Sequence, residues 1–315
     1  MSINGTLNLC KPSGRTSFDI VRQVKSLTHQ RKVGHGGTLD PLASGVLPIC
    51  IGQATRISEF LADSSKSYRA EVTLGVATDT YDAEGAVTST ADPSSVTYSQ
   101  LEEVSQQFQG PILQEPPMYS ALKHEGKRLY QLARQGVVVE REKRETIIHR
   151  LDIIEWAPPV ITMEIECGRG AYVRSLAHDL GQALGCGAHL KGLVRLKTGP
   201  FDIEDSITLE DLVAAVEEGR WEQLLYPTDF ALTDMHAAIL DPKAERAAVS
   251  GQPIPIIYAD YKKIPEPAIS AASSDRSPGT PIRCRAFSLD GRFLAILSAP
   301  TPRGPWAPKK VFPPT

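Results

Sequence analysis

The stretch GHGGTLDPLASGVLPICIG, residues 34–52, joins a glycine-rich turn to an almost uncharged apolar run. Its one charged residue is Asp40, and Pro41 follows directly. The apolar run predicts a buried strand. Carboxylates usually stay in contact with water, so a turn this poor in other polar side chains indicates that Asp40 is held in a defined position. Taken alone, an Asp in a Gly/Pro turn more often caps its own backbone, and both interpretations stay open here.

Length and composition indicate a soluble globular protein. The chain has 315 residues, enough for two domains, with 41% hydrophobic and 23% charged residues. The sequence contains no apolar run of the roughly 20 residues that span a bilayer, and its start lacks the apolar core of a signal peptide. We therefore expect a cytoplasmic protein with no membrane partner. A monomer is expected, because no apolar interface helix is left over.

The cysteines do not predict a metal site. The five cysteines are far apart, none forms a Cys-x-x-Cys pair, and no histidine lies at zinc-ligand spacing from a cysteine pair. Reduced structural thiols are the expectation.

Charge is unevenly distributed along the chain. Residues 231–315 hold 11 Lys and Arg against 7 Asp and Glu, whereas the whole chain has a net charge of −3. Within the acidic first part, residues 120–150 hold 8 basic and 4 acidic side chains. An acidic body with basic stripes is compatible with a polyanion that docks along one face, although solvated surface charge explains the same pattern.

The order of elements predicts an α+β fold with a mixed, largely antiparallel sheet flanked by helices. Strands and helices do not alternate as βαβ units, which argues against a doubly wound sheet. Thr16 and Asp19 form a capping-box pattern before a helix that buries Ile20, Val24 and Leu27. Strands are expected at 6–10, 45–52, 66–75, 137–141, 146–156, 160–167 and 188–201, with further helices at 97–109, up to about 184 and at 208–218.

A second, small and β-rich domain is expected after Pro227, because the chain there changes to short strand-like runs with many prolines. The boundaries are 1–230 for the first domain and 231–315 for the second. RCRAFSLDGRFLAIL predicts a hairpin that turns at Asp290–Gly291. The proline-rich and serine-rich segment around 262–281 indicates a flexible insertion.

Several catalytic signatures are absent. The glycine-rich turn is not a dinucleotide fingerprint, because Leu39 occupies the last required glycine position, and no Gly-Lys-Ser/Thr follows as in a P-loop. The sequence also lacks a Gly-x-Ser-x-Gly elbow and a zinc deaminase signature. A carboxylate that works without a cofactor remains, as nucleophile or base. Asp40 must stay ionised for either role, and Arg174 or Arg169 could favour the charged form.

Longer motifs carry a resemblance. HGGTLDPLASGVLPICIGQATR is similar to the signature segment of the TruB-type tRNA pseudouridine synthases, bacterial enzymes with a C-terminal PUA-like domain. KPSGRTSFDIV, KSYRAEVTLGVATDTYDAEG, QEPPMYSALKHEGKRLYQLARQG and CGRGAYVRSLAHDLGQALGCGAHLKGLVRLKTGPF resemble other motifs of that family, and together they cover most of residues 5–205. The resemblance implies the pseudouridine synthase fold. The ending WAPKKVFPP resembles that of PUA-type RNA-binding modules.

The resemblance assigns roles to individual positions. Asp40 matches the family's catalytic aspartate, and Arg174 the arginine that pairs with the carboxylate. Tyr68 matches the active-site tyrosine, which stacks on the target base and is the candidate acid or base at its C5. Leu193 matches an apolar residue on the other face of the base, and His35 a histidine that holds the RNA loop open.

Three further groups of residues follow from the same comparison. Asp79 matches an acidic residue of the pocket's hydrogen-bond network, and Lys11 lies in the family's Lys-Pro turn, where a structural role is at least as plausible as a catalytic one. The basic residues of the central segment match phosphate contacts to the tRNA T-arm; they are Lys123, Lys127, Arg128 and Arg134.

The implied reaction is isomerisation of uridine to pseudouridine at position 55 of the tRNA T-loop, with base flipping and without a cofactor or metal. The aspartate could attack C1′, attack C6 or remove the C2′ proton, and the sequence does not choose among these paths. Two other functions stay open: an RNA-binding or tRNA-folding factor with secondary or no catalysis, and a base-releasing glycosidase that uses Asp79 or Asp82 as a second carboxylate.

Overall fold

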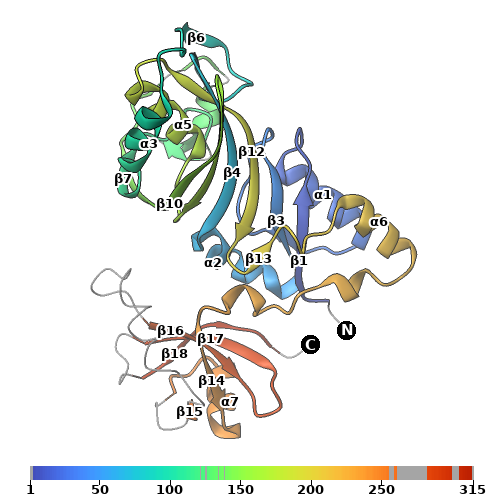
Figure 1. The fold of residues 1–315 in the computed structure, drawn as a ribbon. Coiled ribbons are helices and arrows are strands. Elements are labelled where there is room, and N and C mark those ends of the chain that lie inside the picture. Colours follow the sequence, from blue (N-terminus) through green and yellow to red (C-terminus); the bar gives the residue numbers. More distant parts are fainter. Residues whose placement is uncertain are drawn as a thin grey trace.

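The computed structural model describes residues 3–120, 122–124, 126–133, 135–137, 139–254, 259–260, 282–299 and 305–313. These residues form two bodies, an upper one built on a long curved sheet and a smaller lower one built on a second sheet (Figure 1). The expected insertion at 262–281 lies outside the described residues.

Nine strands form the large sheet in the described part of the chain. Along its main path the order is β1-β3-β12-β4-β11-β10-β7, with β2 on β3 and β13 on β12. The β3–β12 pair is parallel and the other pairs are antiparallel, which confirms the predicted mixed, largely antiparallel sheet. The strands are β1 (Gly5–Lys11), β2 (Val33–His35), β3 (Ser44–Ile51), β4 (Lys66–Leu74), β7 (Gly110–Gln114), β10 (Arg144–Ala157), β11 (Val160–Cys167), β12 (Ala188–Thr198) and β13 (Phe201–Asp202).

Burial along the central strands explains their sequence patterns. In β3, seven consecutive residues from Gly45 to Ile51 are buried, which accounts for its uninterrupted apolar run. In β4, buried positions alternate with partly or fully exposed ones. The alternation places Lys66, Tyr68 and Ala70 on one face of the sheet.

Helices pack against several parts of this sheet: α6 contacts β1, α1 contacts β2, α3 contacts β10, and α5 contacts the central strands β12 and β4 (Figure 1). The predicted capping box is present at α1, because Thr16 and Asp19 bond each other's backbone N–H groups. Ile20 and Val24 are fully buried and Leu27 is partly buried. The helices of this body are α1 (Ser17–Thr28), α2 (Ser58–Asp63), α3 (Tyr98–Gln106), α4 (Leu129–Ala133), α5 (Val173–Ala183) and α6 (Leu209–Glu217), with 3-10 turns η1 (Gly52–Ile57), η2 (Trp221–Leu224) and η3 (Phe230–Leu232).

One predicted strand is wrong. The described residues of 137–141 form no strand, and the chain enters β10 only at Arg144. Gly136 has a φ of 72° and closes a turn after α4. Arg141 then pairs with Glu115 instead of joining a ladder. Two short hairpins that we did not predict are β5 (Val76–Thr78) with β6 (Val87–Thr90), and β8 (Lys123–His124) with β9 (Lys127–Arg128).

The lower body contains a five-stranded sheet in the order β15-β14-β16-β17-β18, covered by α7 (Pro242–Val249). The predicted hairpin is confirmed as β16 with β17, and Gly291 in its turn has a φ of 84°. The expected boundary at residue 230 falls in η3. The strands are β14 (His236–Leu240), β15 (Ala259–Asp260), β16 (Ile282–Phe287), β17 (Phe293–Ala299) and β18 (Ala307–Val311).

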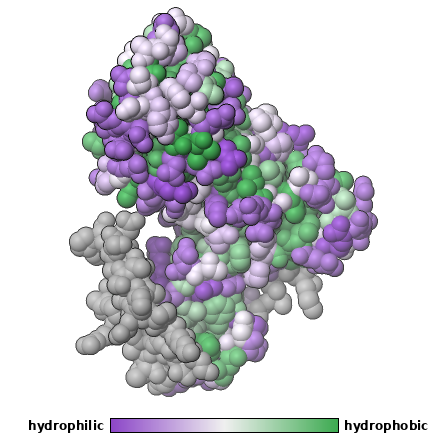
Figure 2. Space-filling model, viewed as in Figure 1, coloured by the Kyte–Doolittle hydropathy of each residue, from purple (hydrophilic) through white to green (hydrophobic). Residues whose placement is uncertain are grey.

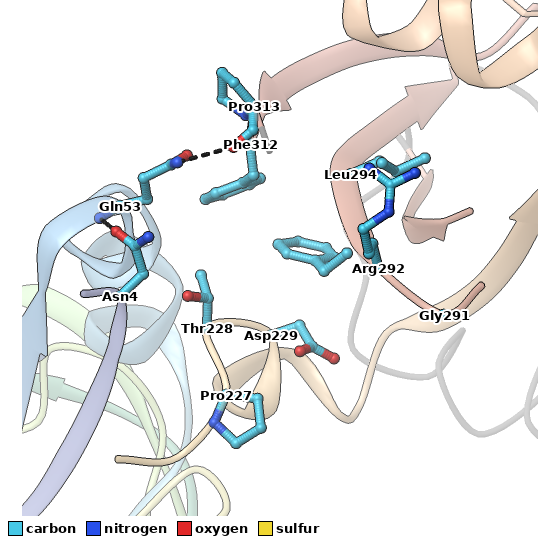
Figure 3. Close-up of a pocket in the computed structure, with 11 residues that line it drawn as sticks. Asn4, Gln53, Pro227, Thr228, Asp229, Gly291, Arg292, Leu294, Phe312 and Pro313 are labelled. Carbon is cyan, nitrogen blue, oxygen red and sulfur yellow. Dashed lines mark hydrogen bonds between the residues drawn. The ribbon is translucent and has the colours of Figure 1, made fainter. Parts of the chain in front are cut away.

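The two bodies share a hydrophobic cluster. Phe60 and Phe201 of the upper body pack in one cluster with Ile296 and Phe312 of the lower body. Beside this cluster lies a cavity of about 390 Å³, which is bordered by residues of both bodies (Figure 3). At its rim the Gln53 side-chain amide donates to Pro313 O at 3.0 Å. The contacts join the C-terminal strand directly to the upper body.

Hydrophobic residues on the visible face of the upper body occur in patches between hydrophilic ones (Figure 2). Among the helices of the described residues, none has the length and apolar character required to cross a membrane.

Candidate active site

Asp40 lies in the loop between β2 and β3, and hydrogen bonds fix the backbone of this loop on both sides of the carboxylate. Ser17 Oγ accepts from Leu39 N–H at 2.9 Å and donates to Leu39 O at 3.0 Å. Gly14 N–H donates to Pro41 O at 2.8 Å. The first turn of α1 and the preceding Lys-Pro turn therefore hold the residues next to Asp40.

A buried lysine adds to this support. Lys11 Nζ donates to Arg15 O at 2.7 Å, to Pro12 O at 2.9 Å and to Pro41 O at 3.3 Å. Burial lowers the pKa of Lys11 to about 8. Since its ammonium group bonds the carbonyls of two turns, the geometry gives Lys11 a structural role.

A second buried cation, Arg195 on β12, holds the other end of the loop. Its Nε donates to Val46 O at 2.7 Å, and its two terminal nitrogens donate to Gly37 O at 3.2 Å and Thr38 O at 3.4 Å. Arg195 is 1% exposed. Sequence reasoning missed this residue, although alternation along β12 puts it on the same buried face as Leu193.

The partner of Asp40 is Arg174, in the first turn of α5. Its Nη2 lies 2.9 Å from Asp40 Oδ2 and donates to Tyr119 O at 2.9 Å, while Nη1 lies 3.3 Å from Asp82 Oδ2. One buried guanidinium therefore bridges two carboxylates. Arg169, the other candidate, points elsewhere: it pairs with Asp63 at 3.0 Å and its side chain is 73% exposed.

The electrostatics of Asp40 balance two opposing effects. Burial raises the pKa of Asp40 above its ordinary value, and the nearby Asp82 carboxylate adds to this rise. Arg174 and, more weakly, Lys11 oppose the rise because they stabilise the charged form. The side chain of Asp40 is nevertheless 39% exposed, so its carboxylate is open to the adjoining cavities.

Two cavities meet at Asp40. The first, of about 250 Å³, is also bordered by Tyr68 on β4, Leu193 on β12 and Tyr172 at the start of α5. Tyr68 and Leu193 are each 8% exposed, and burial raises the pKa of the Tyr68 phenol. An aromatic side chain, an apolar side chain and a paired carboxylate thus border one compact, partly apolar space.

The second cavity, of about 750 Å³, is also bordered by Asp40. His35, Arg128 and Phe18 border it, together with Asp82 and Arg174. Burial lowers the pKa of His35, which favours its neutral form. The structure therefore brings His35 and Arg128 to a space continuous with the Asp40 site.

The position of Asp79 corrects our expectation. Asp79 borders neither cavity, and its Oδ1 accepts from Ala86 N–H at 2.8 Å, which closes the turn between β5 and β6. The carboxylate beside Arg174 is that of Asp82, and Thr80 Oγ1 donates to its Oδ1 at 2.6 Å. The sequence could not separate two acids three positions apart in one polar loop.

The basic segment is only partly described. The β8–β9 hairpin is antiparallel, and the backbone of Lys123 lies opposite that of Arg128, with His124 opposite Lys127. Lys127 and Arg128 are exposed, and Arg128 reaches the second cavity. Arg134 lies outside the described residues. Within the part of the chain that the structure describes, no three His, Cys, Asp or Glu side chains are grouped so that they could hold a metal ion.

Comparison with known sequences decides the family. A sequence model of the TruB family pseudouridylate synthase N-terminal domain matches residues 25–173, and one of the tRNA pseudouridylate synthase B C-terminal domain matches residues 174–233. A tRNA pseudouridine synthase B from Dehalococcoides mccartyi is 42% identical over 310 residues, which cover 98% of this chain and 97% of that protein. The chain belongs to the TruB family of pseudouridylate synthases.

Other comparisons agree with membership of the TruB family. The tRNA pseudouridine synthase B of Symbiobacterium thermophilum is 47% identical over 252 residues, which cover 79% of this chain and 82% of that protein. A chain in the crystal structure of a Cbf5-Nop10-Gar1 complex superposes with a TM-score of 0.74 at 28% identity, over 98% of this chain and 85% of that one. A chain of an H/ACA RNP bound to a substrate RNA containing 2'-deoxyuridine gives a TM-score of 0.72 at 25% identity, with the same coverage. The structural likeness thus extends over the β-rich lower body as well.

Proposed function

We propose that this TruB-family chain isomerises uridine to pseudouridine at position 55 in the T-loop of tRNA, with Asp40 as the catalytic group. The observation that carries the proposal is the Asp40 carboxylate, paired with Arg174 at 2.9 Å and open to a cavity that Tyr68 and Leu193 border. The names of the relatives, tRNA pseudouridine synthase B, support tRNA as the substrate.

The reaction suits this set of residues. In pseudouridine the N1–C1′ bond has been broken and a C5–C1′ bond formed, so the product is an isomer and no group donor is consumed. Asp40 must be ionised to act as nucleophile or base. Arg174 favours that ionised form, and three paths remain available to the carboxylate: attack at C1′, attack at C6 and removal of the C2′ proton.

The target base has to leave its stack to reach Asp40. Extrusion of a base costs a few kcal/mol, and stacking on an aromatic side chain returns about 1–3 kcal/mol. In our proposal Tyr68 supplies this stacking and Leu193 packs on the opposite face of the base. The exposed side chains of Lys127 and Arg128, with Lys123, contact phosphates of the T-arm, and His35 helps to hold the RNA loop open. The protein acts as a monomer.

Release of tritium from a T-arm stem-loop that carries 5-tritiated uridine tests the proposal. Wild type should release tritium without free uracil, and Asp40→Asn should lower the rate at least about 1,000-fold, as expected for loss of a reacting group. Asp152→Asn is a matched control, because Asp152 is an exposed carboxylate on β10 that borders neither cavity. It should retain the wild-type rate.

Two results would contradict the proposal. Free uracil in place of a C-linked base would identify a glycosidase. Salt-dependent RNA binding by wild type without tritium release would identify an RNA-binding factor.

A further inference from the structure

Phe18 is exposed in a helix whose other large apolar residues are buried or partly buried. The ring lies in the first turn of α1, and the residue is 65% exposed, whereas Ile20 and Val24 on the same helix are fully buried. An isolated exposed apolar residue is common on protein surfaces and by itself means little. Phe18, however, borders the second cavity, which also reaches Asp40 and Arg174.

The backbone that carries the Phe18 ring is held at a fixed place relative to Asp40. Ser17, directly before Phe18, makes two hydrogen bonds to the backbone of Leu39, directly before Asp40. The capping box of Thr16 fixes the same helix end. The two segments are therefore joined through Ser17 and Leu39, the residues that directly precede Phe18 and Asp40.

An arginine lies over one face of the ring. The guanidinium carbon of Arg22 lies 5.7 Å from the centroid of the Phe18 ring, and Arg22 also pairs with Asp19. Guanidinium planes and aromatic rings are both surfaces on which unpaired bases stack. With 65% of the residue exposed, the ring remains open to an incoming partner.

The charges around the second cavity favour a neutral ligand over a phosphate. The carboxylates that border it are those of Asp40, Asp82 and Glu84, and the cations are those of Arg128 and Arg174, whereas burial favours the neutral form of His35. Arg174 is already engaged by two of the carboxylates. Phosphate oxygens would meet acidic groups in the interior of this cavity, whereas a nucleobase is uncharged and presents a flat apolar face.

We propose that Phe18, backed by the guanidinium of Arg22, is a stacking platform for a second unpaired base, that of a nucleotide directly next to the target uridine. The proposal rests on the proposed function, because it places the target base in the first cavity and its neighbour in the second. When the target leaves its stack, the neighbouring base loses a stacking partner, and the platform replaces that partner. Phe18 thus contributes to RNA binding and not to the chemical step.

Binding measurements in an Asp40→Asn background test the platform without turnover. The affinity for a fluorescent T-arm stem-loop should fall about 5- to 150-fold in Phe18→Ala, which corresponds to the loss of about 1–3 kcal/mol of stacking. Phe18→Trp should restore it, because indole also stacks. Tyr98→Ala is the matched control: Tyr98 is an exposed aromatic residue on α3 that borders neither cavity, and its loss should leave affinity unchanged.

Removal of the partner base makes the test specific. Stem-loops with an abasic nucleotide directly 5′ or directly 3′ of the target should each be measured with the protein that retains Phe18 and with the Phe18→Ala variant, after both proteins are checked for equal thermal stability. On one of these two RNAs the effect of Phe18→Ala should vanish. An unchanged affinity of Phe18→Ala on the intact RNA, or an equal loss on both abasic RNAs, would overturn the proposal.

The test of the Phe18 platform can fail or succeed independently of the test of the proposed isomerase function. If the wild type released no tritium but Phe18 and the abasic position were still coupled in binding, the platform would stand and the isomerase assignment would fall. If the wild type made pseudouridine and Phe18→Ala bound the RNA normally, the platform alone would fall.

Discussion

The loop around Asp40 and the segment around Arg128 border the same cavity but are supported in opposite ways. The Asp40 loop is bonded to α1 through Ser17, to the Lys-Pro turn through Lys11, and to β12 through Arg195. In the described residues, the β8–β9 hairpin that carries Arg128 is a separate two-stranded sheet, paired only with itself. Both Arg128 and its neighbour Lys127 are exposed.

The Asp40 loop and the β8–β9 hairpin differ in how they are supported because their proposed roles make different demands. A group that reacts must be placed to within a fraction of an ångström, and its charge state depends on fixed neighbours. A cation that attracts phosphate works through a field that extends over several ångströms and tolerates motion. We therefore expect substitutions around Asp40 to change stability and chemistry, and substitutions around Arg128 to change mainly affinity and its dependence on salt.

The largest effect is expected for Arg174→Met. Removal of the guanidinium leaves the carboxylates of Asp40 and Asp82 without their shared partner, which should destabilise the protein by about 3–5 kcal/mol at pH 8. The pKa of Asp40, already raised by burial, should rise further. Because this pKa is raised in the folded state, the loss of unfolding free energy is fully present above it. The loss becomes smaller as the pH falls and Asp40 is protonated.

Urea unfolding at pH 8 and at pH 5 measures this deficit, with Arg174→Lys as the charge-conserving control. A deficit of the same size at both pH values would show that the guanidinium acts by packing alone. The acid limb of the activity profile of any residually active Arg174 variant should also move to higher pH.

A smaller loss of stability is expected for Gly45→Ala. Gly45 has a φ of +99°, and a Cβ atom there would lie 2.3 Å from Arg195 O, at the parallel contact between β3 and β12. Strain and overlap should together destabilise the protein by about 2–3 kcal/mol and disturb the Arg195 contacts that hold the loop. Thermal unfolding and the rate of pseudouridine formation both report on this change.

Gly14 provides the matched control for Gly45. It has a φ of +82°, but nothing lies within 4 Å of the position that a Cβ atom would take, so Gly14→Ala should lose only about 1 kcal/mol from the backbone conformation. Equal losses in the two variants would mean that the Arg195 carbonyl can move aside and that the loop is less rigidly held than the contacts indicate.

The smallest effect is expected for Arg128→Ala. Loss of one phosphate contact should weaken RNA binding a few-fold and lower the slope of log affinity against log salt by about 1, with kcat unchanged. Arg150→Ala, which removes an exposed arginine from β10 that borders neither cavity, is the control. A large drop in kcat for Arg128→Ala would remove the distinction between the two regions.

Local patterns predicted most of the secondary structure. The capping box of Thr16 and Asp19, the apolar run of β3 and the alternation of β4 all depend on neighbours within a few residues, so each was visible in the sequence. The strand expected at 137–141 failed because periodicity alone cannot tell whether a partner strand is available. No ladder reaches the described residues of that range.

Chemical reasoning predicted the residue types of the candidate site, and the family resemblance assigned them to individual positions. The sequence offered Arg174 and Arg169 as partners of Asp40, and only the structure shows Arg174 at 2.9 Å and Arg169 bound to Asp63. It offered Asp79 for the pocket network, and the structure places Asp82 there. Side-chain direction in a loop depends on contacts from distant segments, which spacing does not encode.

The sequence by itself determined that this chain carries an acidic residue in a glycine-rich turn before a buried strand, in a mixed α+β body followed by a β-rich one. Those features rest on local propensity and on the period of apolar residues. Only the tertiary structure showed how three cations from separate segments, Lys11, Arg174 and Arg195, converge on Asp40 and the loop that carries it. A buried charge is stable only where partners converge on it, and that convergence exists only in the folded chain.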